Sequence, residues 1–288
     1  METQRKNTDP STANAAALFA FMQKTATQVE EAIRLDLDPV LTDNDPLLIE
    51  VLRYALFKGG KRLRPVLAIV SSRLCGRDDD TLYLLAAAFE YLHVATLIHD
   101  DVIDHAENRR GREAVVKKYG TGAAILAGDW LHARSMRLIG TLTGQRGLDV
   151  FCDATQAMVD GEFLQLRYVA DSSVTEEQYF AVILRKTARL ISSTCEIGAL
   201  YGNGSPVQAG ALATYGEKIG IAFQIVDDLL DYLGEEQATG KQVGNDFAEG
   251  KMTLPLIHAV SHAAERDRAE LLQGLQGDRR DGTGCKKA

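Results

Sequence analysis

Residues 80–104 read DTLYLLAAAFEYLHVATLIHDDVID, a long apolar run that ends in acidic residues. Apolar side chains recur at every third or fourth position, which predicts a helix. Asp100 and Asp104 are four positions apart, so both carboxylates project from one side of that helix. Carboxylates this close repel each other unless cations compensate them. The stretch therefore predicts a buried helix whose acidic end borders a cleft, with a solvated helix face as the alternative for an isolated motif of this kind.

The same helical periodicity extends along the rest of the chain, whereas the alternating pattern of strands is almost absent. Short Gly- or Asp-containing connections separate the segments. We therefore predict an all-α protein of about ten helices in a single domain, residues 1–288. The ends, residues 1–12 and about 275–288, are predicted to be disordered. The predicted helical segments are 14–35, 46–58, 64–75, 80–104, 121–141, 147–169, 175–202, 205–235 and 252–274.

The composition narrows the class of protein. Of 288 residues, 45% are hydrophobic, and the net charge of −8 argues against general nucleic-acid binding because phosphates would be repelled. The four cysteines are widely separated, which is typical of reduced thiols in a cytoplasmic protein. We find no signal peptide and no run of about 18 uncharged apolar residues, so we expect no transmembrane helix.

A second acidic motif repeats the spacing of the first. Asp227, Asp228 and Asp231 follow the apolar stretch GIAFQIV. If the two helices face each other, carboxylates line two walls of one site. Oxygen ligands without histidine or cysteine suit Mg²⁺, which binds through carboxylates together with substrate phosphates. The alternative is a coincidence among the 40 acidic residues.

Two clusters of cations accompany the acidic motifs. Arginine binds phosphate oxygens through two parallel hydrogen bonds, and lysine adds a point charge. Each cluster alone also fits a solvated patch or a set of ion-pair partners, but a phosphate site beside a metal site explains all the charges together. Two separate diphosphate groups fit this arrangement. The cations are Lys58, Lys61, Arg62 and Arg64 in KGGKRLRP, and Arg109, Arg110 and Arg112 in NRRGR.

These motifs resemble the trans-prenyltransferases, the polyprenyl diphosphate synthase family. The resemblance spans residues 59–255 and is strongest to the medium- and long-chain members, of octaprenyl and heptaprenyl type, that make quinone side chains. It implies an isoprenoid-synthase-type helix bundle around a central cavity, a Mg²⁺-dependent prenyl transfer and a homodimer. The motifs, in the order of the family, are GGKRLRP, LHVATLIHDDVID, RRG, KTARL, FQIVDDLLD and EGKMTLP.

The resemblance also implies a role for each matching residue. Three Mg²⁺ ions per site are implied, and their expected ligands are Asp100, Asp104 and Asp227, supported by Asp101, Asp228 and Asp231. The allylic diphosphate is expected to lie on Arg109, Lys186, Thr187, Gln224, Lys241 and Lys251. Isopentenyl diphosphate is expected to lie on Lys61, Arg64, His93 and Arg110. A core histidine at position 93 and ordinary packing at Thr187 and Gln224 are the alternatives.

The implied chemistry needs no side-chain nucleophile, and no Ser-His-Asp or Cys-His arrangement stands out in the sequence. Metal and cations stabilise charge on the departing diphosphate. The double bond of isopentenyl diphosphate then attacks the allylic carbocation, and the released diphosphate takes the proton. Water must be kept from the cation, so an apolar cavity is required.

Product length is expected to depend on the helix before Asp100. Ala95 and Thr96 lie one turn, roughly 6–7.5 Å, deeper on the same face. Short-chain members of the family often carry aromatic residues here, so small side chains predict an open tunnel and a product longer than farnesyl. Leu92 and Phe89 follow in the next turns, and Phe89 is a candidate floor. The alternative for these small residues is plain helix packing.

Helical character fades near Leu275, and GDRRDGTGCKKA at the end does not resemble a helix of this family. We therefore expect a C-terminus that is truncated relative to the family. Three alternative functions stay open: a geranylgeranyl or farnesyl diphosphate synthase, a subunit of a heteromeric prenyl synthase, and a terpene cyclase. The intact acidic motifs disfavour a non-catalytic subunit. GGKRLRP and the Arg109–Arg110 pair disfavour a cyclase, which has no isopentenyl site.

Overall fold

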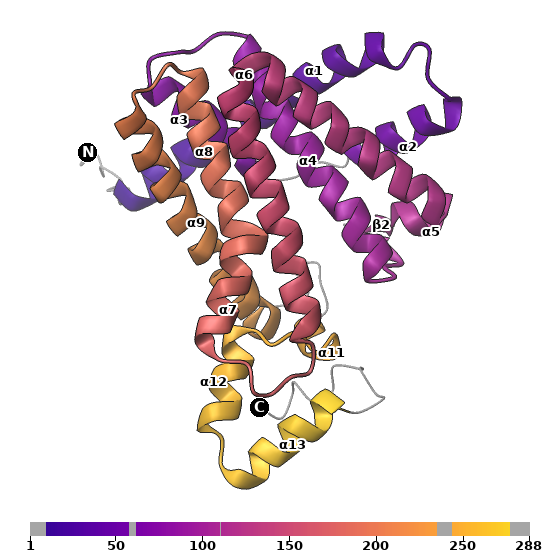
Figure 1. Cartoon of the computed structure of the whole chain (residues 1–288), viewed down its shortest axis with the longest axis vertical. Coiled ribbons are helices and arrows are strands. Elements are labelled where there is room, and N and C mark those ends of the chain that lie inside the picture. Colours follow the sequence, from indigo (N-terminus) through magenta and orange to yellow (C-terminus); the bar gives the residue numbers. More distant parts are fainter. Residues whose placement is uncertain (1–9, 58–61, 110, 235–243, 277–288) are drawn as a thin grey trace, which may run out of the picture. The chain divides into compact units, whose positions relative to one another are not determined.

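The structure, a computed structural model, describes residues 10–57, 62–109, 111–234 and 244–276. The chain divides into two compact units. Figure 1 labels their helices and strands along the chain. Unit 1 comprises Met1–Gln145 and Gly198–Gly204, and unit 2 comprises Arg146–Ile197 and Ser205–Ala288. The single domain stays a prediction.

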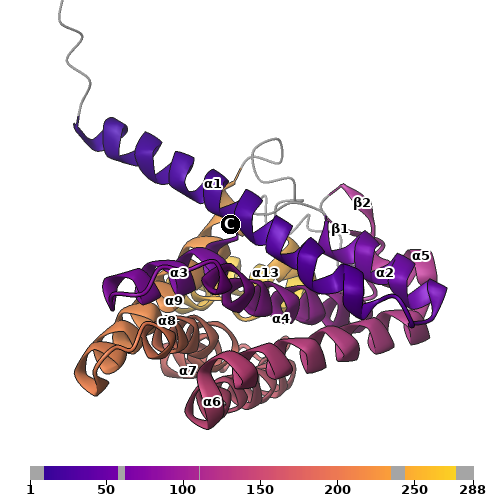
Figure 2. The same ribbon diagram turned by 90° about the horizontal axis from the view of Figure 1, so that it is seen from above.

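Unit 1 is built around α4, against which the other helices of the unit pack, as Figure 2 shows for α1 and α3. A two-stranded antiparallel ribbon follows α4 and is the one sheet in the described part of the chain. The elements of this unit are α1 (Pro10–Val40), α2 (Pro46–Leu56), α3 (Leu63–Leu74), α4 (Thr81–Ile103), β1 (Asn108–Arg109), β2 (Arg112–Glu113), α5 (Val115–Tyr119) and the first part of α6 (Thr121–Arg167).

The central position of α4 follows from its composition. Its residues 85–92 are all buried, so apolar side chains surround the helix rather than forming a single stripe. By length and composition, α4 alone among the described helices is apolar enough to cross a membrane, but 67% of its apolar window is buried inside the structure. Such burial is typical of the central helix of a folded core.

Unit 2 packs its helices around a second apolar core, which includes Tyr179, Phe247, Leu256 and Leu275. The second part of α6 contributes to this unit. The other elements are α7 (Glu176–Ile183), the π-helix η1 (Leu184–Ala188), α8 (Arg189–Tyr201, whose last residues belong to unit 1), α9 (Pro206–Leu233), α11 (Asn245–Ala248), α12 (Leu254–His262) and α13 (Glu265–Gln276).

The helix boundaries agree with the local chemistry of the sequence. Thr175 and Ser205 begin α7 and α9 with capping boxes, in which the hydroxyl and a glutamine three residues later satisfy backbone groups at the helix start. Gly144 has a φ of 68°, which is not helical, so α6 is interrupted between the predicted segments 121–141 and 147–169.

Two predicted segments differ from the structure. Segment 175–202 contains the π-helix η1 between α7 and α8. Segment 252–274 was predicted as one helix and is two, because Ala263 is extended and ends α12. Leu256 on α12 and Leu275 on α13 pack in the same core, so the chain must reverse between them.

The ends of the described chain overlap the stretches predicted to be disordered. Helix α1 begins at Pro10 and α13 ends at Gln276. Of the residues predicted to be disordered, 1–12 and about 275–288, residues 10–12, 275 and 276 belong to these two helices. Residues 1–9 and 277–288 lie outside the described residues, as does the final segment GDRRDGTGCKKA, on which the predicted truncation rests.

Replacing Gly220 with alanine is expected to destabilise unit 2. A Cβ at this position of α9 would lie 2.6 Å from Cα of Ala188 and 3.0 Å from its Cβ, so the backbones must separate. We expect a loss of roughly 1–3 kcal/mol in the free energy of unfolding, measured with urea.

The matched control is Gly210→Ala, on the same helix. A Cβ there meets nothing within 4 Å, so the helix-propensity gain of about 0.5–1 kcal/mol remains. Equal effects of the two substitutions would contradict the close packing of α9 on Ala188.

Candidate functional site

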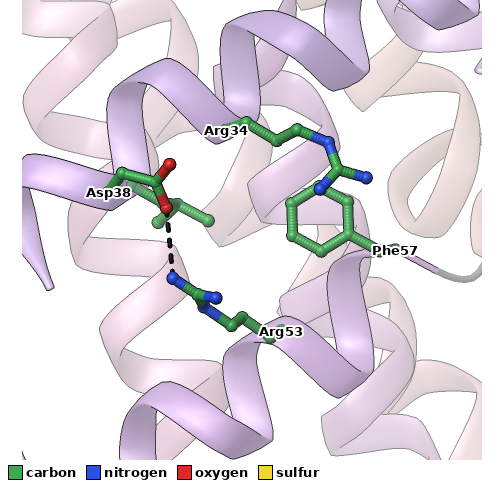
Figure 3. A pocket seen from close by; sticks show the side chains of 5 residues that line it. Arg34, Asp38, Arg53 and Phe57 are labelled. Carbon is green, nitrogen blue, oxygen red and sulfur yellow. Dashed lines mark hydrogen bonds and ion pairs between the residues drawn. The ribbon is translucent and has the colours of Figure 1, made fainter.

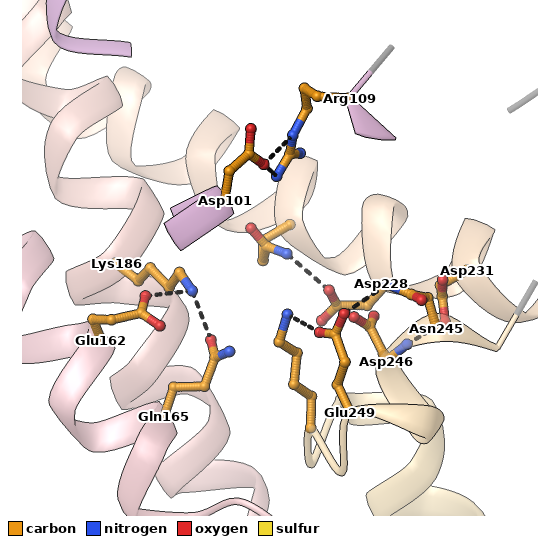
Figure 4. Close-up of polar contacts among 12 residues, drawn as sticks. Asp101, Arg109, Glu162, Gln165, Lys186, Asp228, Asp231, Asn245, Asp246 and Glu249 are labelled. Atoms are coloured by element: carbon orange, nitrogen blue, oxygen red, sulfur yellow. Dashed lines mark hydrogen bonds and ion pairs between the residues drawn. The ribbon is translucent and has the colours of Figure 1, made fainter. Parts of the chain in front are cut away.

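The first acidic motif ends α4 in unit 1. Asp104 is the C-cap residue, and its backbone N–H donates to the carbonyl of Asp100 at 2.8 Å. Asp101 differs from both because its side chain is buried and accepts from Arg109 Nε at 2.7 Å (Figure 4). Asp100 is half-buried and Asp104 is exposed. The motif thus has one internally paired aspartate and two that border solvent.

The position of these acids matters electrostatically. The C-terminus of a helix carries partial negative charge, so anionic side chains there are unfavourable unless a cation lies close. Arg109, on β1, supplies one cation for Asp101. A divalent cation beside Asp100 and Asp104 would add to this compensation.

The second acidic motif lies near the end of α9 in unit 2 and divides in the same way. Asp227 is exposed, Asp231 is half-buried and Asp228 is buried. Asp228 accepts from the hydroxyl of Tyr179 at 2.6 Å and from Gln224 Nε2 at 2.8 Å, one on each carboxylate oxygen. Both carboxylate oxygens of Asp228 therefore accept hydrogen bonds from side chains of the protein itself.

A hydrogen-bonded chain extends from Asp228 into the predicted phosphate site. The hydroxyl of Thr187 donates to Gln224 Oε1 at 2.9 Å, and Gln224 in turn donates to Asp228. Burial raises the pKa of Asp228, while the hydrogen bonds from Tyr179 and Gln224 oppose that rise. Thr187 and Gln224 are thus joined in one network, whatever their role toward a ligand.

A further carboxylate, Asp246 on α11, adjoins this motif. Its backbone N–H donates to Asp231 Oδ2 at 3.0 Å (Figure 4). Burial and the negative charge of Asp231 raise the pKa of Asp246 to about 7, against the opposing effect of Lys251. Lys251 forms an ion pair with Glu249. The segment after α9 therefore brings an acid and a cation to the second motif.

Lys186 lies on η1, where the backbone departs from α-helical geometry. Its Nζ lies 3.1 Å from Gln165 Oε1 and forms an ion pair with Glu162, both on α6. The two helices approach closely, since a Cβ on Gly161 would lie 2.5 Å from the backbone N of Lys186. Single π-turns inside helices are frequent at functional sites.

The donor set is compatible with Mg²⁺. In the described part of the chain, no three or more His, Cys, Asp or Glu residues are arranged to hold a metal ion. Mg²⁺ does not require such a cage, because it keeps waters and takes oxygen ligands from one or two carboxylates and from substrate phosphates. Burial and, to a smaller extent, neighbouring aspartates raise the pKa values of Asp228 and Asp246, and a nearby cation would favour their ionised forms.

The residues predicted for isopentenyl diphosphate are described only in part. Arg64 is on α3, and its Nε atom is buried without a hydrogen-bond partner among the described residues. His93 is half-buried on α4. The predicted residues that lie outside the described ones are Lys61, Arg110 and Lys241.

The residues predicted to set product length all lie on α4. Ala95, Leu92 and Phe89 are buried, and Thr96 is half-buried with its hydroxyl donating to the carbonyl of His93 at 2.9 Å. This burial fits both a tunnel wall and plain packing, so the role in product length stays a prediction.

Several residues that form hydrogen bonds or ion pairs with the predicted site residues were not identified from the sequence. Tyr179 has no signal of its own, because a tyrosine on an apolar helix predicts core packing. Glu162 and Gln165 carried a weak signal, as polar residues three apart in GEFLQL. Two further acids were given no role: Asp246, three residues before EGKMTLP, and Glu249, the first residue of that motif.

A pocket elsewhere in unit 1 contains none of the predicted residues (Figure 3). Arg34 lies over the ring of Phe57 at 4.3 Å, and Arg53 pairs with Asp38 at 3.2 Å. Arg34 also pairs with Glu30. Both arginines are already matched by partners, so we assign no ligand to this pocket.

Replacing Asp246 with asparagine is expected to stabilise the metal-free chain at pH 8. Folding raises the pKa of Asp246 from 3.8 to about 7, so wild-type stability falls as the pH rises between these values. Above that range, the variant avoids a cost of at most about 4 kcal/mol, and near pH 4 the advantage disappears. Urea unfolding in EDTA across this pH range measures the difference.

Asp153→Asn serves as the control, because Asp153 is an exposed acid of the same unit. We expect it to change the free energy of unfolding by less than about 0.5 kcal/mol at either pH. A D246N variant whose stability follows wild type at every pH would contradict the crowding of negative charge at Asp246.

Two relatives show what the sequence is similar to. The chain is 37% identical over 261 residues to an octaprenyl diphosphate synthase of Haemophilus influenzae, covering 90% of this chain and 79% of the relative. It is 38% identical over 258 residues to a short chain isoprenyl diphosphate synthase of Methanothermobacter thermautotrophicus, covering 88% and 78%.

Solved structures agree with the sequence comparison. A decaprenyl diphosphate synthase from Rhodobacter capsulatus superposes with a TM-score of 0.84 at 37% identity, covering 94% of this chain and 83% of that one. A polyprenyl synthase from Caulobacter crescentus, complexed with calcium and isoprenyl diphosphate, gives 0.85 at 32% identity, covering 94% and 82%. The predicted all-α isoprenoid-synthase fold is confirmed.

A family model described as polyprenyl synthetase matches residues 45–288. This match covers the two acidic motifs, both clusters of cations and the segment after α9. The chain therefore belongs to the polyprenyl synthetase family, a family of prenyltransferases, as its motifs predicted.

Proposed function

We propose that this chain is a Mg²⁺-dependent trans-prenyltransferase that makes a medium- or long-chain all-trans polyprenyl diphosphate. Its substrates are isopentenyl diphosphate and an allylic diphosphate. The observation that carries the proposal is the matched arrangement of the two acidic motifs, each with a buried, internally satisfied second aspartate. The octaprenyl and decaprenyl synthases among the similar proteins support the longer product.

The residues of the site have separable tasks in this reaction. Asp100, Asp104 and Asp227 would hold Mg²⁺, and three ions per site are part of the proposal. Mg²⁺ supplies Lewis-acid stabilisation of the negative charge on the departing diphosphate. Lys186 and Lys251, which pair with Glu162 and Glu249 in this structure, would bind diphosphate oxygens directly.

The proposed reaction makes and breaks the following bonds. The C1–O bond of the allylic diphosphate breaks, and the diphosphate leaves with the electron pair. The double bond of isopentenyl diphosphate then forms a carbon–carbon bond to the allylic cation. A proton is lost to the released diphosphate, which restores a double bond and an allylic product one isoprene unit longer. The side chains orient the two diphosphates and exclude water.

We also propose a cytoplasmic homodimer that serves the synthesis of a quinone side chain. On the second part of α6, Val159, Phe163 and Leu166 are exposed apolar residues at helical spacing. They would form part of a self-complementary interface. Sedimentation velocity would measure the oligomeric state, and a monomer at micromolar protein concentration would contradict the homodimer.

The first test is to incubate the purified chain with Mg²⁺, farnesyl diphosphate and labelled isopentenyl diphosphate. Reversed-phase chromatography then sizes the products. We expect polyprenyl products longer than geranylgeranyl, and none when EDTA replaces Mg²⁺. A geranylgeranyl product would favour the short-chain alternative, which the similarity to the M. thermautotrophicus enzyme also supports. No elongation from farnesyl or geranylgeranyl diphosphate would contradict a homomeric enzyme.

The same assay tests the predicted tunnel wall. Phenylalanine at Ala95 or Thr96 is expected to shorten the product, because an aromatic ring one turn below Asp100 would stop the growing chain. Thr96 is half-buried and tolerates the larger residue better than buried Ala95. If both variants elongate to wild-type length, α4 does not line the tunnel here.

Tyr179→Phe is expected to raise the Mg²⁺ concentration needed for half-maximal activity by roughly three- to tenfold. The substitution removes the hydroxyl that donates to Asp228 Oδ2, so this carboxylate loses one of its two donors. The freed oxygen is expected to disturb Asp227 and Asp231 beside it.

Tyr215→Phe on α9 is the control for Tyr179→Phe, because its side chain is 56% exposed. Initial rates over a Mg²⁺ titration give the comparison. An unchanged Mg²⁺ requirement in Y179F would show that Tyr179 contributes only to packing.

A further inference from the structure

A buried ion pair joins Arg62 and Glu90 in unit 1. Their side chains are only 2% and 3% exposed. Arg62 precedes α3, and its guanidinium also donates to the carbonyl of Leu56 at the end of α2, at 3.2 Å. Glu90 lies on α4, one turn before His93. This pair therefore connects three helices beside the residues predicted to hold isopentenyl diphosphate.

The backbone of Arg62 has an unfavourable conformation. Its φ of 48° lies in the left-handed region, which residues with a Cβ rarely adopt. A buried arginine in this conformation must be held by its side-chain contacts. The contacts that hold it are those to Glu90 and Leu56.

Two guanidinium groups lie within the influence of one carboxylate. Burial lowers the pKa of Arg64, and the charge of Glu90 opposes that effect, so Glu90 acts on Arg64 as well. However, the described hydrogen bonds of Glu90 go to Arg62. The Nε atom of Arg64 is buried and has no hydrogen-bond partner in the described ranges. This nitrogen of Arg64 can therefore donate to an anion that the described residues do not supply.

We propose that Arg62 is a positioning residue, which neutralises Glu90 and so leaves Arg64 to bind the diphosphate of isopentenyl diphosphate. This inference rests on the proposed function. Without Arg62, Glu90 would be a buried carboxylate without a partner, which is strongly unfavourable. Arginine and carboxylate groups form paired hydrogen bonds readily, so Glu90 would then capture Arg64. The substrate would have to displace that carboxylate.

A purely structural role predicts a different outcome. If the pair only stabilised unit 1, removing either partner would harm the protein alike, because each leaves one buried charge unpaired. Our proposal predicts an asymmetry instead. Loss of Arg62 weakens isopentenyl diphosphate binding, whereas loss of the Glu90 charge does not.

The test compares Arg62→Met, Glu90→Gln and the double variant R62M/E90Q in the full chain with Mg²⁺. KM is measured for each substrate with the other saturating. For R62M we expect KM for isopentenyl diphosphate to rise about tenfold or more, with KM for the allylic substrate changed less than about threefold. For E90Q and for the double variant, both KM values are expected within about threefold of wild type.

Arg134→Met is the matched control. It removes the cation from a second buried ion pair of unit 1, Arg134–Asp36, whose side chains are 12% and 5% exposed. We expect a lower unfolding midpoint with both KM values unchanged. The proposal is overturned if R62M leaves KM for isopentenyl diphosphate unchanged, if E90Q raises it equally, or if the double variant does not recover.

Two further measurements keep the test decisive. If R62M does not fold, Arg62→Lys with and without Glu90→Gln gives the same comparison, because lysine lacks the paired geometry. Calorimetric binding of inorganic pyrophosphate in EDTA reports on the cations without turnover. Weaker binding in R62M, restored in the double variant, in a chain that does not elongate would support the inference and reject the proposed function. Equal binding in all variants would reject the inference.

Discussion

Negative charge near the carboxyl ends of two helices is the constraint on which the rest of this structure depends. Each acidic motif adds three carboxylates to a helix end that already carries partial negative charge. The chain compensates the buried members with its own donors. Arg109 serves Asp101, while Tyr179 and Gln224 serve Asp228. The members at the surface are Asp100 and Asp104 in the first motif and Asp227 in the second, and we propose that these bind Mg²⁺.

The two motifs share one pattern for the same geometric reason. Residues i and i+4 of a helix lie on one side, whereas residue i+1 is rotated by about 100°. In both motifs that rotation places the second aspartate in the protein interior, with Asp101 at 2% and Asp228 at 4% exposure. The repeated acidic spacing thus produces two kinds of carboxylate. One kind anchors its helix to neighbouring elements, and the other kind remains at the surface.

Three described cations of the predicted phosphate site form ion pairs with carboxylates of the chain. Lys186 pairs with Glu162, Lys251 with Glu249 and Arg109 with Asp101. A diphosphate reaching these groups replaces a carboxylate as their partner. Affinity then depends on a difference between two charged partners rather than on an unpaired cation. Among the described cations of this site, Arg64 differs because its Nε atom has no hydrogen-bond partner, while the neighbouring Glu90 accepts from Arg62.

Much of the fold could be predicted from local patterns. Apolar spacing predicted α4 and α9, and the acidic motifs with the cation clusters pointed to Mg²⁺ and diphosphates. The break at Ala263 and the π-helix at Lys186 could not be predicted. Neither stretch contains a glycine or proline that would mark a break or a distortion in a helix.

The sequence by itself determined the helical class, the identity of the charged groups and their spacing along each helix, because these follow from short-range periodicity. Only the tertiary structure decided which carboxylate is buried, which cation each acid binds, and that Tyr179, Asp246 and Glu162 join the site. Asp246 is 15 residues from Asp231 along the chain, and Tyr179 is 49 residues from Asp228. No local pattern encodes such pairings, because they arise when separate helices pack and exclude water from the groups between them.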